Sequence, residues 1–152
     1  MTKDELAREF LNQLAESEKS LLQELSVIEE HLRSLRKGDV ADQADVVYES
    51  ARKVALLEAL EQIRKAMLYF SAFNGTPKKR AEEGALVEVE LKGSRAYFLL
   101  IPDLGTTCKL EIDGREYRTL SPSAPLYRAV AGKRAGEQIK VAEFEGRIVS
   151  VE

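Results

Sequence analysis

The chain has 152 residues, of which 44% are hydrophobic and 32% are charged, and its formal net charge is −3. This length allows one domain or two small ones, and the negative charge argues against a protein that binds nucleic acid mainly through phosphate contacts. The only cysteine, Cys108, and the only histidine, His31, exclude an internal disulfide and a zinc site with several such ligands. The sequence shows no apolar signal core and no membrane-spanning run, so we expect a cytoplasmic protein without a membrane partner.

The first long segment, residues 2–37, contains neither proline nor glycine. Its apolar residues recur at heptad spacing, which predicts a helix with a coiled-coil seam. These seam positions are Leu6, Phe10, Leu14, Leu21, Leu25, Ile28, Leu32 and Leu35. Thr2 and Glu5 form a capping-box pattern at the predicted start, and Gly38 predicts the end.

A second helix is predicted over residues 40–73. Its apolar stripe is expected to consist of Val47, Ala51, Val54, Leu56, Leu60, Ile63, Met67 and Phe70. Two helices of similar length joined by a short turn must lie antiparallel. We therefore predict an antiparallel coiled coil over residues 1–75, called the hairpin below, with an acidic tip at residues 38–45.

The remaining chain changes from helical to alternating periodicity. Residues 76–81 have the composition of a linker, and residues 82–152 are expected to form a globular domain with a twisted antiparallel sheet. Its strands are predicted at 86–91, 95–101, 109–112, 116–120, 137–142 and 146–151. Asp113 and Gly114 are typical of a tight β-turn, and residues 125–131, followed by Gly132, predict a short helix. The expected fold class is α+β.

The tip carries three acids, Asp39, Asp42 and Asp45, within seven residues. Carboxylates at a helix start accept hydrogen bonds from free backbone amides, so helix capping is one interpretation. The other is that Asp39 and Asp42 present oxygens to a cation outside the chain. Two oxygen ligands are too few for a dedicated magnesium site, but they suffice to share an ion that another protein holds. A hairpin with acids at its end thus predicts insertion into a partner's metal site.

A second pattern lies between residues 120 and 133. It resembles the signature of the Gre transcript-cleavage factors, which reads Ile-Ser-x-x-Ser-Pro-x-x-Arg-Ala-Leu-x-Gly-Lys. The positions that coincide are Ser121, Pro125, Arg128, Ala129, Gly132 and Lys133. Ala124 stands where the family has serine. Residues 38–45 also align with the family's tip, Gly-Asp-Leu-Ser-Glu-Asn-Ala-Glu, with Asp42 in place of glutamate.

The resemblance implies a coiled coil followed by an FKBP-like domain, and a factor that enters the secondary channel of bacterial RNA polymerase. By resemblance, Asp39 and Asp42 help the polymerase hold a second Mg and the attacking water for cleavage of backtracked RNA. The chain would need no cofactor of its own, would not itself be an enzyme, and would contact nascent RNA only indirectly. Expected polymerase-binding residues are Asp45, Ser121, Ser123, Pro125, Arg128 and Lys133.

Two alternatives stay open. Asp39, Asp42 and Ala44 also match the tip motif of DksA, a secondary-channel factor that regulates initiation with ppGpp and does not cleave RNA. In that case ppGpp would act through the polymerase, although the cysteine zinc finger of DksA is excluded here by the single cysteine. The third interpretation is a coiled-coil scaffold whose tip acids only cap a helix. The basic residues 78–80 are typical of a solvated linker.

Overall fold

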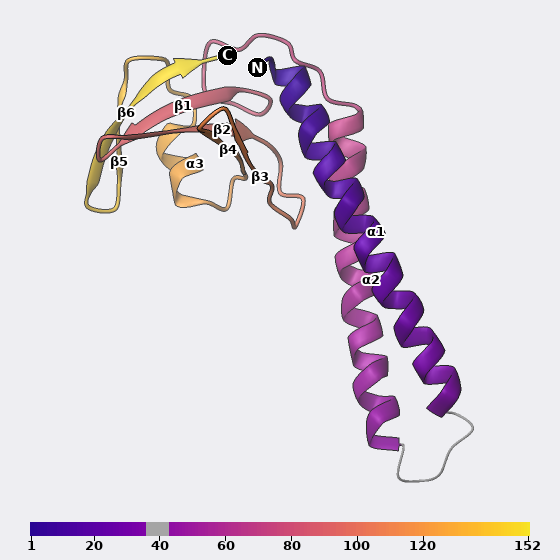
Figure 1. Cartoon of the computed structure of the whole chain (residues 1–152). Helices are drawn as coiled ribbons and strands as arrows, with labels where there is room; N and C mark the ends of the chain where they lie inside the picture. Colours follow the sequence, from indigo (N-terminus) through magenta and orange to yellow (C-terminus); the bar gives the residue numbers. More distant parts are fainter. Residues whose placement is uncertain (36–42) are drawn as a thin grey trace.

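The computed structural model describes residues 1–35 and 43–152, and its architecture is α+β. Two long helices, α1 (Lys3–Leu35) and α2 (Gln43–Ser71), lie side by side as the hairpin (Figure 1). Ion pairs join Glu18 to Arg64 and Glu24 to Arg52, so the two helices run antiparallel, as predicted. In the described part of the chain, no helix is long and apolar enough to cross a membrane.

The predicted capping box is present at the start of α1. The backbone N–H of Glu5 donates to the Thr2 hydroxyl oxygen at 3.1 Å, and the Thr2 N–H donates to the Glu5 carboxylate at 3.2 Å. Both bonds satisfy amides that have no partner inside the helix. The start of α1 can thus be predicted from local sequence.

Six strands form one mixed sheet in the order β3-β4-β2-β1-β6-β5. They are β1 (Leu86–Leu91), β2 (Ser94–Leu100), β3 (Lys109–Ile112), β4 (Arg115–Leu120), β5 (Gln138–Val141) and β6 (Phe144–Val151). Neighbouring strands are antiparallel except β2 and β4, which are parallel, with Tyr97 opposite Tyr117 and Leu100 opposite Leu120. The prediction of a wholly antiparallel sheet was wrong at this pair.

The connection between β2 and β3 explains the parallel pair. It carries the chain past the position of β4, so that β3 lies at the edge of the sheet. The predicted tight turn then returns the chain through Asp113 (φ 52°) and Gly114 (φ 75°), and β4 fills the gap. Buried Ile101, Leu104 and Cys108 hold the connection against the core. Long-range packing therefore decides the strand order.

Two apolar cores lie on opposite faces of the sheet, because side chains alternate along a strand. One core contains Val87, Leu100 and Ile148 and packs against α3 (Pro125–Val130). The other contains Leu86 and Leu99 and packs against the first turns of α1 and the last turns of α2.

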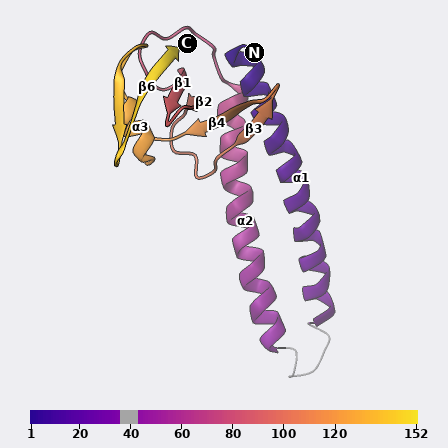
Figure 2. The same cartoon turned by 60° about the vertical axis from the view of Figure 1, so that its left-hand side comes forward.

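The second core joins the hairpin to the sheet, and we call it the shared core. It contains Leu6, Phe10, Leu14 and Phe70 from the helices, together with Tyr117 and other residues of the sheet and its connections. The rings of Phe10 and Phe70 are 5.6 Å apart, centroid to centroid. The base of the hairpin lies beside the sheet, and the rest extends away from it (Figure 2).

The seam of the hairpin agrees with the prediction on α1 but not at the start of α2. Val47, Ala51 and Val54 were expected to face α1, but they are exposed, Val47 by 70% and Val54 by 55%. The prediction was wrong because the step from 54 to 56 breaks heptad spacing. Among the less exposed positions of α2, one set keeps steps of four and three, and it consists of Glu49, Lys53, Leu56, Leu60, Ile63, Met67 and Phe70.

Substitution of Phe10 by alanine tests the shared core. Because Phe10 is fully buried, we expect Phe10→Ala to lower the free energy of unfolding by about 3–5 kcal/mol. Urea unfolding followed by far-UV circular dichroism, which is dominated by the helices, and by near-UV signals from tyrosine, three of whose five residues lie in the globular domain, should show both transitions shifting together. Val27→Ala is the control, because Val27 is 66% exposed and should change stability by less than about 0.5 kcal/mol. A shift of the helical transition alone would contradict a shared core.

Candidate functional site

The proposed magnesium-sharing acids Asp39 and Asp42 lie outside the described residues. The third acid of the tip, Asp45, is exposed in the first turn of α2. α2 has 29 residues, so at 1.5 Å per residue it spans about 43 Å. Asp45 therefore lies at the far end of the hairpin, about 30 Å along α2 from Ala66 of the shared core.

A polar cluster crosses the hairpin one turn further along α2. Glu49 occupies a seam position and is only 7% exposed. Its carboxylate is 3.4 Å from His31 Nδ1 and 3.8 Å from an Arg52 guanidinium nitrogen. Arg52 also donates to the Glu24 carboxylate at 2.7 Å, and this bond raises the pKa of Arg52. The cluster thus links both helices close to the tip.

Sequence reasoning missed Glu49, although a signal was present. Counting the heptad back from Phe70 in steps of three and four reaches position 49, which shows that an acid stands in the apolar seam. A polar residue at one seam position commonly fixes the register of a coiled coil at a cost in stability. We therefore assign to Glu49 the alignment of α1 and α2 near the tip.

Replacing Glu49 by leucine tests this assignment. A buried acid is desolvated, and an apolar side chain of similar size is often more favourable; we therefore expect Glu49→Leu to raise the free energy of unfolding by about 1 kcal/mol. The matched control is Glu58→Leu on the exposed face of α2, where a change below about 0.5 kcal/mol is expected. If Glu49→Leu destabilises the protein in thermal or urea unfolding, the contacts with His31 and Arg52 outweigh the desolvation and the account of the seam is wrong.

The expected polymerase-binding residues of the C-terminal signature lie in one continuous segment, residues 121–133, which we call the docking segment. The Ser121 and Ser123 hydroxyl oxygens are 3.1 Å apart. Pro125 is the first residue of α3, and Arg128 is exposed in its last turn. Ser121, Ser123, Pro125 and Arg128 therefore lie within or just before α3, in the globular domain and not on the helix that carries Asp45 (Figure 1).

The end of the docking segment also has a structural role. The Lys133 ammonium donates to the Gln138 carbonyl at 3.3 Å. The Lys133 carbonyl accepts from the Ala81 N–H, and the Gly132 N–H donates to the Ala81 carbonyl, both at 2.8 Å. Ala81 is 1% exposed. The chain that leaves the hairpin is thus held against the docking segment.

The start of α3 departs from the usual helix beginning. Ala124 is the N-cap residue and has the extended backbone of an N-cap (φ −77°, ψ 136°), but it makes no side-chain capping bond. A serine here, as in the family that the sequence resembles, could accept from an amide of the first turn. Packing of Val130 and its neighbours in the core beneath α3 therefore stabilises this helix.

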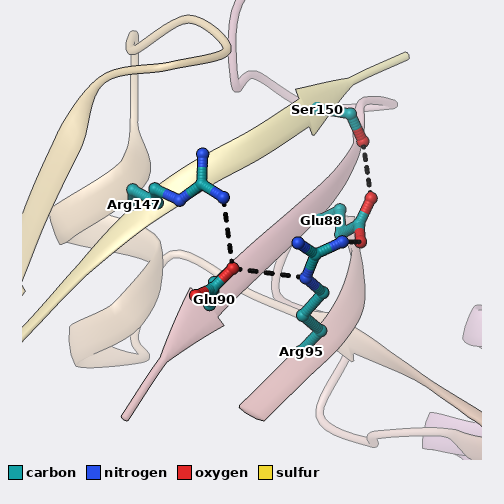
Figure 3. A network of polar contacts seen from close by, with 5 residues as sticks. All are labelled: Glu88, Glu90, Arg95, Arg147 and Ser150. Carbon is teal, nitrogen blue, oxygen red and sulfur yellow. Dashed lines mark hydrogen bonds and ion pairs between the residues drawn. The ribbon is translucent and has the colours of Figure 1, made fainter. Parts of the chain in front are cut away.

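A charged cluster covers the open part of the sheet (Figure 3). Glu88 and Glu90 of β1 contact Arg95 of β2 at 3.5 and 3.2 Å, Glu90 also contacts Arg147 of β6 at 3.3 Å, and Glu88 accepts from Ser150. Two acids and two bases give no net charge, so this cluster does not steer an ion of either sign. It gives a polar, hydrated surface to the part of the sheet that the hairpin leaves uncovered.

Among the described residues, neither a metal site nor an activated thiol is found. Among them, no group of three or more His, Cys, Asp or Glu side chains is placed to hold a metal ion. Burial raises the pKa of the Cys108 thiol to about 11, so this thiol is protonated and a poor nucleophile near neutral pH.

Comparison with known proteins gives only distant likenesses. No family model and no curated protein matches the sequence. Among solved structures, GreA factor homolog 1 (Gfh1) of Thermus thermophilus is 16% identical, with 93% of this chain and 94% of that chain covered and a TM-score of 0.37. A second structure of the transcription factor Gfh1 is 16% identical, covers 94% and 93%, and has a TM-score of 0.38.

Gfh1 of Thermus aquaticus is 18% identical, with 100% of this chain and 96% of that chain covered and a TM-score of 0.35. TM-scores below 0.5 at such low identity carry no argument about fold or function. The FKBP-like assignment of the sheet domain stays a prediction.

Proposed function

We propose that the chain is a Gre-like transcription factor that binds bacterial RNA polymerase, with its hairpin inside the secondary channel and the docking segment at the channel rim. The observation that carries the proposal is the pair of sequence signatures: the docking segment lies in the globular domain at the base of the hairpin, and the acidic tip lies in the sequence between its two helices. The hairpin is two helices wide, roughly 20 Å, because one helix with its side chains measures about 10–12 Å across. Such a shape suits entry into a narrow channel.

In this proposal the tip assists a reaction that the polymerase carries out. Asp39 and Asp42 would supply oxygen ligands to a second magnesium ion that the polymerase holds, and would help position the water that attacks backtracked RNA. Magnesium prefers oxygen ligands and retains several waters, so two carboxylates suit a shared ion better than a site of their own. The chain would thus stimulate an activity of the polymerase and would not be an enzyme itself.

The docking segment supplies the contact outside the channel. Arg128 is exposed and makes no ion pair with any residue that the structure describes. A guanidinium group binds carboxylates through two parallel hydrogen bonds, so an acidic surface of the polymerase would be its partner. Ser121 and Ser123, earlier in the docking segment, add two hydroxyl groups. Lys133 is assigned to the same surface, although its ammonium group already donates to the Gln138 carbonyl.

RNA cleavage by backtracked polymerase complexes tests the tip. We expect the wild-type chain to release short 3′ RNA fragments, and Asp39→Ala or Asp42→Ala to reduce release to the polymerase's intrinsic rate because a magnesium ligand is lost. Asp42→Glu extends the carboxylate by one methylene and should raise the rate by up to about 100-fold, since a misplacement of about 1 Å can cost that much.

The matched control for the tip is Glu30→Ala, at an exposed position of α1 outside the tip, which should leave cleavage unchanged. If the wild-type chain releases no RNA above the intrinsic rate, and Asp42→Glu does not restore release, the cleavage role is refuted even where the chain binds.

The match of Asp39, Asp42 and Ala44 to the DksA tip favours a second candidate, a regulator of initiation without cleavage. This candidate predicts that the chain shortens or lengthens the lifetime of promoter complexes, that ppGpp acting through the polymerase modifies the effect, and that Asp39→Ala removes it while binding persists. An unchanged promoter-complex lifetime with and without ppGpp would exclude it.

A further inference from the structure

Lys3, the first residue of α1, makes a contact that neither the capping of α1 nor the shared core requires. Its side chain is buried, with 6% of the residue exposed. The ammonium donates to the Thr76 carbonyl at 2.6 Å and to the Gly84 carbonyl at 3.1 Å. Both acceptors belong to the connector, residues 72–85, which leads from α2 to β1. The Lys3 side chain thus hydrogen-bonds to the connector both in its first half, at Thr76, and near its end, at Gly84.

The burial of a charged group here is unfavourable and needs a compensating contact. Desolvation and the nearby Lys78 ammonium lower the pKa of Lys3, whereas the carboxylates of Glu152 and Asp4 raise it. A methionine or leucine would fill the same space without desolvating a charge. The ammonium group therefore provides something that apolar packing does not, namely hydrogen bonds of fixed direction to two carbonyls.

A surface hollow of about 410 Å³, open to solvent, lies beside the contact, and its lining includes Phe73, Thr76, Lys78 and Gly84. Asp4 also approaches the connector so closely that a Cβ atom on Gly75 would lie 2.6 Å from its carboxylate.

A hairpin attached at one place can still change its direction. The shared core holds α1 between Leu6 and Leu14, and apolar packing is not directional. Within that stretch the Gln13 side chain donates one exposed hydrogen bond to the Lys109 carbonyl of β3 at 2.8 Å. The Lys3 contact is a further attachment, at the very end of α1. At 1.5 Å per residue the 33 residues of α1 span about 50 Å, so a rotation of about 5° at the base would move the far end by about 4 Å.

The connector also touches the docking segment. Ala81 exchanges backbone hydrogen bonds with Gly132 and Lys133, each at 2.8 Å. Hydrogen bonds therefore hold the connector to α1 at Lys3 and to the docking segment at Ala81.

We infer that Lys3 is a positioning residue that fixes the direction of the hairpin relative to the globular domain, and so sets where the tip lies when the docking segment is bound. The part that concerns the tip rests on the proposed function, whereas the part that concerns direction does not. Lys3 contacts neither substrate nor metal in this role, and it acts only through the orientation of α1.

The direction of the hairpin can be measured without the polymerase by double electron–electron resonance. Spin labels are attached at Ser34→Cys on α1 and Lys140→Cys on β5, both exposed, while the buried Cys108 stays unreactive. We expect one narrow distance distribution in the otherwise wild-type chain. Lys3→Met keeps the apolar stem but removes the donors, and it should shift or broaden the distribution by several ångströms.

Two further variants separate direction from stability. Lys79→Met makes the same chemical change at an exposed position of the connector and should leave the distribution unchanged. Lys3→Arg keeps the charge and the N–H donors and should retain a single narrow distribution. This variant still tests the inference if Lys3→Met does not fold. A lower melting temperature of Lys3→Met with an unchanged distance distribution would mean a merely structural role and would overturn the inference, as would a broad distribution for Lys3→Arg.

Cleavage assays with polymerase then connect direction to the tip. Lys3→Met should lower the rate of fragment release at least tenfold, while its affinity for core polymerase stays within about twofold, because the docking segment is intact. A changed distance distribution together with no cleavage by the wild-type chain would refute the proposed function and leave the positioning role standing. An unchanged distribution refutes the positioning role whatever the polymerase does.

Discussion

The packing of the hairpin base against one face of the sheet is the contact on which the rest of the structure depends. Phe10 and Phe70 meet in a core that also contains Leu99 and Tyr117 of the sheet. Burial of large apolar side chains is worth about 1.5–3 kcal/mol each. Here the hairpin and the sheet bury such side chains against each other, and each alone would expose them to water. Two α-helices that project far beyond any globular core can therefore keep a defined base.

Beyond that base the hairpin is stabilised only by its own seam and by ion pairs between the helices. Exposed pairs such as Glu18–Arg64 contribute little individually, and the seam contains the acid Glu49 close to the tip. Stability therefore falls from the sheet toward the far end, while Glu49, with His31 and Arg52, specifies how the helices align there.

Local signals in the sequence predicted the local structure. Thr2 and Glu5 predicted the first turn of α1, and Asp113 and Gly114 predicted a tight turn, because both patterns act between near neighbours. The parallel pairing of β2 with β4 could not be predicted, since it depends on where a connecting loop packs. Lys3 gave no sequence signal at all, because its acceptors are backbone carbonyls more than seventy residues away. The docking segment was predicted as one loop and helix, and the structure has it so.

Binding to core RNA polymerase tests the central claim most directly. Purified chain and core polymerase, mixed and separated by gel filtration, should give a complex with one chain per polymerase. Arg128→Ala should weaken this complex by about 2–5 kcal/mol if its guanidinium pairs with a buried carboxylate of the polymerase, whereas Asp39→Ala should leave binding intact. If the wild-type chain does not co-elute with the polymerase, the chain is a coiled-coil scaffold whose tip acids only cap α2, and the account is contradicted.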